Sequence, residues 1–395
     1  MSQQAAPTQS LQGIEVPASS VDPRAFFAAT RRLTIPQKTF SFAGLGSTDT
    51  ISMLQTGILS QLTIHAYGTL TVALPTGTCA TTARWPYDLL RAVRFSANGQ
   101  SNLINVPGSF LKLRDIQARG DLTDRGVPNG FGGSGAAGTA RTQGTLSLAA
   151  ESWGVASNAT AIPAAAYPVD LNWVVPVAFD QVNLLGAIFA QTSSTDLVLY
   201  LDWAPVTDLF VLTGTATVTL TLTVVIESTL YSIPQGPGGI VVPDLSSFHS
   251  YIVTRTPTVA NGVNEIRLVG QGVGRSLLRI NARILNGAAP GVPLPVNQTN
   301  FGQIGWRYGG NDTPEIYTEG QHLRYVNERT FNADIGALFG FYCLDFASEN
   351  AFRDSIDEGT ASELRLITEI PNGVTLTTPV AEYAQETVFA GATGA

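Results

Sequence analysis

Charged residues are scarce in this sequence of 395 residues. Asp, Glu, Lys and Arg together make up 13% of it, against roughly 25% in an average soluble domain. Hydrophobic residues make up 44%, and the formal net charge is only -8. A chain with this much apolar surface and this little net charge collapses around a core, which excludes disorder over most of its length. At about 100–200 residues per domain, the length predicts two or three domains.

Basic residues are fewer than acidic ones. There are 22 Lys and Arg residues against 30 Asp and Glu residues, and the sequence pI is about 4.9. Nucleic-acid binding depends on clustered Lys and Arg side chains that neutralise phosphates. We therefore expect no direct contact with nucleic acid.

Cysteine and histidine are almost absent. Cys79 and Cys343 each lie in or beside an apolar stretch, so we expect buried free thiols and no disulfide framework. The three histidines, His65, His249 and His322, are more than 70 residues apart and lack the spacing of a zinc site. The sequence therefore predicts no metal and no cofactor.

Long apolar runs are missing too. No window of 18 residues is uninterruptedly apolar, and the first residues have neither the basic start nor the apolar core of a secretion signal. We expect the protein to be made and kept in a cytoplasm, or carried by a particle that is assembled there.

Catalytic motifs are not found. Gly133-Ser134-Gly135 lacks the second glycine of a nucleophile elbow, because Ala136 follows, and no phosphate-binding GxxxxGK loop occurs. Pairs of acids suited to glycoside hydrolysis stay open: Asp345, Glu349, Asp354, Asp357 and Glu358 in one segment, and Asp196 and Asp202 around an apolar strand. We expect the first group to be a solvated surface or a cation-bridged contact, and we assign no catalytic residue.

Alternation with a period of two is the strongest positive signal. From Thr215 to Thr223 every odd position is Thr, while the even positions from Ala216 to Ile226 are apolar. Such a segment is a strand with one face on a core and the other towards water or a partner. The same pattern covers 61–72, 197–203 and 278–284. Further strands are predicted at 85–96, 143–149, 171–179, 182–190, 263–269, 300–308, 338–346, 363–370 and 376–389.

Two helices interrupt the predicted strands, one in each half of the chain. The first begins at Ser109 and ends at Gly120, and the second covers 319–331. A shorter helix begins near the N-terminus with Asp22 as its cap and Pro23 at its first position.

A stretch rich in Pro and Gly follows Ile233 and divides the chain. We expect an N-terminal arm with a short helix at 1–30, a first jelly roll at 31–232, a linker at 233–247, a second jelly roll at 248–389 and a C-terminal tail at 390–395. Long strands with wide connections fit jelly rolls better than up-and-down barrels. Both halves combine many short strands with one helix, although no repeat of fixed period is found.

Four groups of residues carry a resemblance to a known family, in the family's order. They are ILSQLTIHAYGTLTVA at 58–73, at the place of the opening strand of the first sandwich; NWVVPVAF at 172–179 with NLLGA at 183–187; IVVPDLS at 240–246; and the helix 319–331 ahead of GFYC at 340–343. In these residues the sequence resembles the double jelly-roll major capsid proteins of the tectivirus type, whose fold is shared with adenovirus hexon. The likeness covers most of the chain, but the Gly-rich stretch 126–138 has no counterpart.

This resemblance implies an all-β fold with two eight-stranded jelly-roll β-sandwiches side by side and one short helix inserted in each. It also implies a non-enzymatic major capsid protein, located in the virion and assembled in the host cytoplasm. Homotrimeric capsomers of pseudo-hexagonal outline would tile an icosahedral shell, in a bacteriophage with an internal membrane. The implied partners are other copies of the chain, penton or vertex proteins and minor capsid proteins.

The N-terminal arm faces the internal membrane in particles of this type. The resemblance therefore makes Arg24, Phe26, Phe27, Arg31 and Arg32 candidates for contact with anionic lipid headgroups. The alternative is that these residues pack beneath the first sandwich.

Two other functions stay open on the sequence alone. One is a carbohydrate-active β-sandwich enzyme, and the other is a trimeric viral spike or receptor-binding protein.

Overall fold

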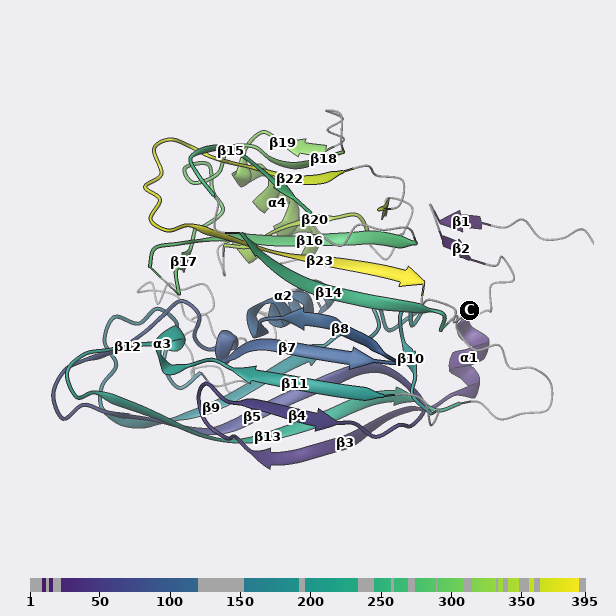
Figure 1. Ribbon diagram of the computed structural model, residues 1–395, viewed down its shortest axis with the longest axis horizontal. Coiled ribbons are helices and arrows are strands. Elements are labelled where there is room, and N and C mark those ends of the chain that lie inside the picture. Colours follow the sequence, from purple (N-terminus) through teal and green to yellow (C-terminus); the bar gives the residue numbers. More distant parts are fainter. Residues whose placement is uncertain are drawn as a thin grey trace, which may run out of the picture.

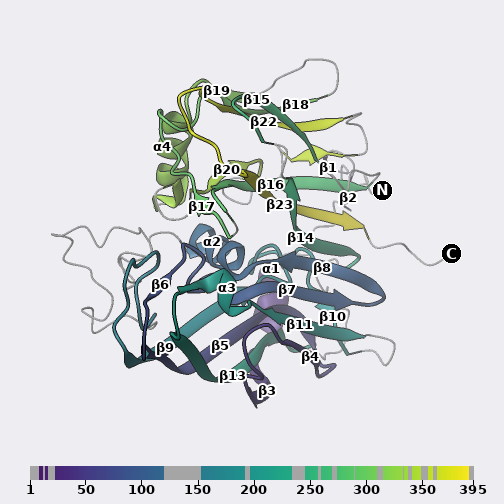
Figure 2. The ribbon, with the colours of Figure 1, turned by 60° about the vertical axis from the view of Figure 1, so that its left-hand side comes forward.

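Two β-sandwiches lie one against the other in the computed structural model of the chain, with a helix between them (Figures 1 and 2). The structure describes residues 9–11, 14–16, 23–119, 153–191, 196–233, 245–256, 259–268, 274–288, 290–308, 315–331, 333–336, 340–347, 355–358 and 363–390.

The first sandwich is a jelly roll of eight main strands. One sheet has the order β3 (Arg32–Ser41), β13 (Thr217–Tyr231), β5 (Ile58–Ala73) and β9 (Ala165–Val175). The facing sheet has the order β4 (Thr48–Ser52), β11 (Leu197–Trp203), β7 (Leu90–Ala97) and β8 (Gln100–Val106). Numbered along the chain, the two sheets read 1-8-3-6 and 2-7-4-5, which is the double Greek key of a jelly roll.

The second sandwich repeats this strand order. One sheet has the order β14 (Ser247–Thr256), β23 (Val380–Ala390), β16 (Arg275–Asn286) and β20 (Tyr342–Asp345). The facing sheet has the order β15 (Gly262–Arg267), β22 (Leu364–Ile370), β18 (Ile304–Tyr308) and β19 (Glu315–Tyr317). These strands also read 1-8-3-6 and 2-7-4-5, so the predicted pair of eight-stranded jelly rolls is confirmed.

Several shorter elements complete the fold. They are the strands β1 (Gln9–Leu11), β2 (Ile14–Val16), β6 (Cys79–Thr81), β10 (Ile188–Phe189), β12 (Phe210–Leu212), β17 (Val292–Pro293) and β21 (Ile356–Asp357), and the helices α1 (Pro23–Ala29), η1 (Tyr87–Leu89) and α3 (Val206–Leu209).

Each jelly roll carries one longer helix between its fifth and sixth strands. In the first roll this is α2 (Gly108–Arg119), and in the second it is α4 (Gly320–Phe331). The predicted helices at 109–120 and 319–331 are thus confirmed to within a residue. The apolar face of α2 is fully buried, with Phe110, Leu113 and Ile116 in the core of the first sandwich. Leu323 anchors α4 in the second core.

The two sandwiches share one sheet. β8 of the first roll pairs in parallel with β14 of the second, with Tyr251 opposite Ile104 and Ile252 opposite Asn105. A single sheet of ten strands therefore runs from β4 through both rolls. This pairing fixes the rotation of one sandwich relative to the other, because neighbouring strands must keep their ladder of backbone hydrogen bonds.

The alternating strands bury the faces that their sequences predict. On β13, Leu220, Leu222 and Ile226 are buried, while Thr219 and Thr221 are exposed. The core positions predicted in 61–72 are buried on β5 in the same way. The expected buried free thiols at Cys79 and Cys343 are confirmed.

Two strand predictions are corrected by the structure. The segment 58–73 is the third strand of the first roll, because β3 and β4 precede it. The segment 182–190 contains only the two-residue strand β10. Its first half is a turn in which Asp180 Oδ1 accepts the backbone N–H groups of Val182 and Asn183 at 2.8 and 2.5 Å.

The other segments named in the sequence analysis lie between two strands or outside the residues that the structure describes. The expected linker at 233–247 lies between the end of β13 and the start of β14, and its residues 234–244 are outside the described part. The predicted strand at 143–149, the Gly-rich stretch 126–138 and the tail residues 391–395 are outside it as well.

Candidate functional site: a charged junction between the sandwiches

Ionised side chains fill the layer where α2 of the first roll meets β14, β16 and β23 of the second. Most of its side chains are buried, although the chain is poor in charge, and only Arg255 among them is exposed, at 41%. Charges leave water only when they are paired and hydrogen-bonded. The residues of this junction are Arg84, Asp88, Arg114, His249, Arg255, Arg279, Arg283, Asp345, Glu382 and Glu386.

Glu386 is the centre of one half of the junction. It lies on β23, is 0% exposed, and accepts at Oε1 from Arg114 Nε at 2.6 Å and from His249 Nε2 at 3.0 Å. Its Oε2 accepts from Arg279 Nη1 at 3.3 Å. Burial acts to raise the pKa of Glu386, but these three partners outweigh it and hold the pKa well below its ordinary value.

His249 extends this half towards the first sandwich. Its Nδ1 lies 2.7 Å from the carbonyl oxygen of Pro176, while its Nε2 faces Glu386. A carbonyl oxygen and a carboxylate both accept hydrogen bonds, so the two bonds form together only in the protonated imidazole. A positively charged His249 therefore fits this site best.

Glu382 is the centre of the other half. Its Oε1 accepts from Arg255 Nε at 2.7 Å and Arg84 Nη2 at 3.4 Å, and its Oε2 accepts from Arg283 Nε at 2.9 Å. Burial acts to raise the pKa of Glu382, but the three arginines overcome it and lower the pKa to about 2. Arg283 also donates from Nη2 to Asp88 Oδ2 at 3.2 Å.

Three of these ion pairs cross from one sandwich to the other: Arg84 with Glu382, Asp88 with Arg283, and Arg114 with Glu386. Breaking one partner of such a buried pair is strongly destabilising, although the net gain from the whole pair is small. Each of these three pairs therefore requires the two rolls to keep this mutual arrangement.

Strand register explains why these residues meet. On β16, Arg279 lies opposite Glu386 of β23, and Arg283 lies opposite Glu382. Residues four apart on a strand share a face, so both arginines point out of the second core. The alternation in 278–284 predicts this polar face. It does not indicate that α2 of the first roll covers the face and leaves Arg279 and Arg283 only 5% and 1% exposed.

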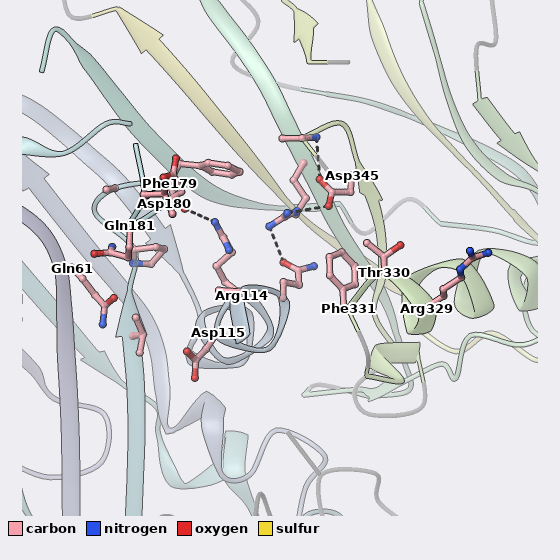
Figure 3. Close-up of a pocket in the computed structure, with 18 of the residues that line it drawn as sticks. Gln61, Arg114, Asp115, Phe179, Asp180, Gln181, Arg329, Thr330, Phe331 and Asp345 are labelled. Atoms are coloured by element: carbon pink, nitrogen blue, oxygen red, sulfur yellow. Dashed lines mark hydrogen bonds and ion pairs between the residues drawn. The ribbon is translucent and has the colours of Figure 1, made fainter. Parts of the chain in front are cut away.

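A cavity of about 880 Å³ opens beside the junction. Figure 3 shows it between α2, the segment that holds Phe179 to Gln181, and the C-terminal half of α4. Arg114 and Arg279 line its inner end, where Arg114 Nη2 donates to the carbonyl oxygen of Phe179 at 2.7 Å and Arg279 Nη2 donates to Asp345 at 3.0 Å.

The structure separates the residues that were candidates for membrane contact. Phe26 is 0% exposed and belongs to a small core cluster with Ile58 and Tyr231. Phe27 is half-buried beside Tyr231, with ring centroids 5.8 Å apart. Arg31 and Arg32 are exposed, and the side chain of Arg24 lies outside the described residues. Phe26 and Phe27 therefore pack against other residues of the same chain. Contact of the arm with a membrane stays a prediction.

The acids considered for catalysis are placed in three different ways. Asp202 accepts two hydrogen bonds from Arg94 at 2.9 and 3.0 Å, and Asp345 belongs to the junction.

Glu358, expected on a solvated or cation-bridged surface, is instead 2% exposed, and neither of its oxygens has a hydrogen-bond partner among the described residues. Burial raises the pKa of Glu358 to about 7, with Arg275 lowering it and Asp357 raising it. Glu349 and Asp354 lie outside the described residues.

The part of the chain that the structure describes holds neither a cluster of metal ligands nor a membrane-spanning helix. Among the described residues, no three His, Cys, Asp or Glu side chains are grouped so as to hold a metal ion. No helix in that part is long and apolar enough to cross a membrane.

Strand order, helix position and the shared sheet together define a double jelly roll. No protein-family model matches the sequence, and no curated protein matches it either. Solved structures do match. The chain is similar to the major capsid protein of Sulfolobus turreted icosahedral virus, at 13% identity and a TM-score of 0.62, over 91% of this chain and 97% of that one.

Two further solved structures are similar over nearly the whole chain. The protein VP54 of PBCV-1 gives a TM-score of 0.54 at 12% identity, over 93% of this chain and 97% of that one. The Faustovirus major capsid protein gives 0.52 at 10% identity, over 92% and 90%. The fold of this chain is therefore the double jelly roll of viral major capsid proteins.

Proposed function

We propose that this chain is a non-enzymatic major capsid protein that assembles into homotrimeric capsomers of an icosahedral shell. The observation that carries the proposal is the presence of two jelly rolls with the same strand order, held in one arrangement by the shared sheet and the charged junction. Three such chains around a threefold axis present six similar sandwiches, and an outline close to a hexagon can tile a surface.

The similarity to viral capsid proteins supports this proposal at the level of fold. Fold alone does not determine function, so the supporting feature of this chain is its rigid pairing of two like units. The same reasoning favours a shell protein over a spike, because tiling needs the hexagonal outline and a spike at a vertex does not.

The mass of the purified protein tests the trimer. We expect a stable particle near three times the chain mass of 41.7 kDa at micromolar concentration, by sedimentation equilibrium. Trimer contacts in a capsomer are permanent and should bury a large area. A persistent monomer under these conditions would contradict the proposal. Gel electrophoresis and electron microscopy of purified particles then separate a shell protein from a spike. A shell protein is the most abundant band on the gel and covers the faces of the particle in the images.

We also propose that Arg32, the first residue of β3, and Arg31 just before it face an internal membrane within the particle. Both side chains are exposed, and basic residues near an anionic bilayer gain about 1 kcal/mol each. In a flotation assay we expect the full chain to rise with vesicles that contain phosphatidylserine and to stay behind with neutral vesicles. The double variant Arg31→Glu with Arg32→Glu should lose at least tenfold of this binding.

A matched control comes from two exposed arginines elsewhere, Arg91 on β7 and Arg267 on β15. The variant Arg91→Glu with Arg267→Glu has the same change of net charge and should float like the unchanged chain. Equal loss in both double variants would show a response to net charge only, and would count against contact through the arm.

A further inference from the structure

Inside the chain, one jelly roll already binds another through a helix and the outer face of a sheet, the face turned away from the core of its own sandwich. The helix α2, which follows the fifth strand of the first roll, lies on the outer face of the second roll's sheet of β14, β23, β16 and β20. Arg114 of α2 donates to Glu386 on β23 at 2.6 Å, and Gln117 of α2 donates to Asn281 on β16 at 2.7 Å. This contact shows what such a face can hold.

The first roll has an equivalent sheet whose outer face is uncovered. Its sheet of β3, β13, β5 and β9 has the same strand order, 1-8-3-6. Tyr67 on the outer face of β5 is 41% exposed. Beside it is a block of exposed threonines from β5 and β13, in which Thr69 lies opposite Thr221 and Thr71 lies opposite Thr219.

The second roll has an equivalent helix whose outer side is uncovered. The helix α4 follows the fifth strand of its roll, as α2 does in the first, and both helices have 12 residues. Tyr325 of α4 is 62% exposed, and His322, Glu328 and Arg329 are exposed too. Aromatic residues are enriched in protein interfaces.

These two uncovered surfaces lie too far apart to meet within one chain. Figure 1 shows the sheet of β3, β13, β5 and β9 along the lower border of the molecule and α4 in its upper half, and Figure 2 shows the same separation. The surfaces can therefore meet only when they belong to different copies.

A shared irregularity gives the correspondence between the covered and the uncovered sheet. In each roll the third strand has one extra residue relative to the eighth strand, at Ser60 in β5 and at Leu278 in β16. Counted from these two residues, Arg283 on the covered face corresponds to His65 on the uncovered face. The side chain of His65 is 39% exposed, whereas Arg283 is 1% exposed beneath α2.

The uncovered face has a neutral side chain where the covered face has one of its central acids. Val225 lies opposite His65, just as Glu382 lies opposite Arg283. Tyr67 and the threonine block come next along the strands. A helix laid on this face would therefore cover hydroxyl and apolar groups, and little of the cost of burying charges would arise. Such a surface suits a contact between separate molecules.

We propose that α4 of one copy packs on the outer face of β5 and β13 of a second copy, and so repeats between chains the contact that α2 makes within the chain. The inference rests on the proposed capsomer. The partner follows from the internal repeat, because the covered sheet of this kind holds the helix of a jelly roll. The backbone pairing of β8 with β14 is not expected to recur, since Pro36 on β3 has no N–H to donate.

This contact joins two different surfaces and is therefore head-to-tail. A head-to-tail contact closes into a ring when its rotation divides the circle evenly, and a trimer is a ring of this kind. The six sandwiches of the trimer would then be linked alternately by the contact of α2 and by that of α4.

Charged substitutions on the two surfaces test the proposal. Tyr67→Asp and Tyr325→Asp each place a carboxylate in the contact, and both sites are exposed in the single chain, so folding should be unaffected. By sedimentation equilibrium we expect each variant to raise the dissociation constant of the oligomer at least tenfold. The control is Val211→Asp on β12, which also puts a carboxylate in place of an exposed large hydrophobic residue, 54% exposed, but outside the contact. It should assemble like the unchanged chain.

The outcomes separate this inference from the proposed function. If the unchanged chain is itself a monomer, both fail. If it forms an oligomer and both tyrosine variants keep its dissociation constant, the capsomer stands and the contact of α4 is overturned. An equal rise in the control would overturn it too, because the response would then not depend on the two surfaces.

A second measurement covers the case in which a variant misfolds. A benzoylphenylalanine in place of Tyr325 reacts on illumination with whatever lies against it, and mixing isotope-labelled with unlabelled chains identifies cross-links between copies. We expect a product of two chain masses whose joined peptide comes from 61–73 or 217–231 of the other copy. Cross-links only within one chain, or only to another segment, would overturn the proposal.

Discussion

Glu386→Gln is expected to lower the free energy of unfolding by about 3–5 kcal/mol, the range for removing one partner of a buried ion pair. The substitution keeps the size of the side chain and removes its charge. Arg114, Arg279 and His249 then stay buried around a neutral amide, one end of which is a donor and faces donors. Urea unfolding followed by tryptophan fluorescence measures the loss, because Trp173 and Trp203 are buried in the first core.

Glu265→Gln is the matched control for this experiment. Glu265 on β15 also pairs with two arginines, Arg307 on β18 and Arg365 on β22, but its side chain is 29% exposed. Exposed ion pairs contribute little, since water already solvates both charges. The control should unfold at nearly the same urea concentration as the unchanged chain. Similar losses in the two variants would show that burial of the junction does not matter.

Strand alternation is the reason that so much of the fold can be predicted from the sequence. β5, β11, β13 and β16 each have one face on a core, so their apolar residues recur at every second position. The helices α2 and α4 follow from their apolar faces and from the residues at their ends. None of these signals depends on a distant part of the chain.

The strands that the sequence does not predict lack this alternation for a physical reason. β3 lies at the edge of its sheet, carries Pro36 and Lys38, and has no fully buried position. Edge strands are kept polar and irregular, which limits their pairing with other chains. β8 and β14 meet in the middle of the shared sheet, where the burial pattern depends on which sandwich lies on each side.

The junction is still less visible in the sequence. Arg114 and Glu386 are 272 residues apart, and neither stands in a recognisable motif. The polar face of β16 predicts only that water or a polar part of another element lies opposite it. The packing of Phe26 against Ile58 cannot be predicted from the sequence either, because it depends on where the chain folds back. The aromatic and basic residues near the N-terminus, taken alone, fit a membrane-facing arm.

The two rolls also show why strand order can repeat without a sequence repeat. A jelly roll needs apolar residues at alternating positions of eight strands and turns of suitable length, and many sequences satisfy this requirement. The helix between the fifth and sixth strands recurs for the same architectural reason. In this chain residues of both helices line the cavity beside the junction, so the internal repeat places one equivalent element of each roll at that cavity.

The stability of the chain should have a maximum near pH 5. On the acid side, the pKa of Glu382 is about 2 in the folded chain, and that of Glu386 is also well below the ordinary value of 4.5. A lowered pKa of an acid stabilises the folded state above the unfolded pKa. That stability is lost as the pH falls from about 4.5 towards 2, by about 3 kcal/mol for Glu382 alone.

On the other side of the maximum, Glu358 acts in the opposite sense. Burial raises its pKa to about 7, so the folded chain binds more protons than the unfolded chain between about pH 4.5 and 7. The free energy of unfolding therefore falls as the pH rises through this window.

Urea unfolding at half-unit steps from pH 3 to 8 measures both limbs of this pH profile, the acid limb below the maximum and the upper limb above it. Glu358→Gln should flatten the upper limb and leave the acid limb in place, because the amide that replaces the carboxyl group does not titrate. An upper limb that is unchanged in this variant would show that another group causes it.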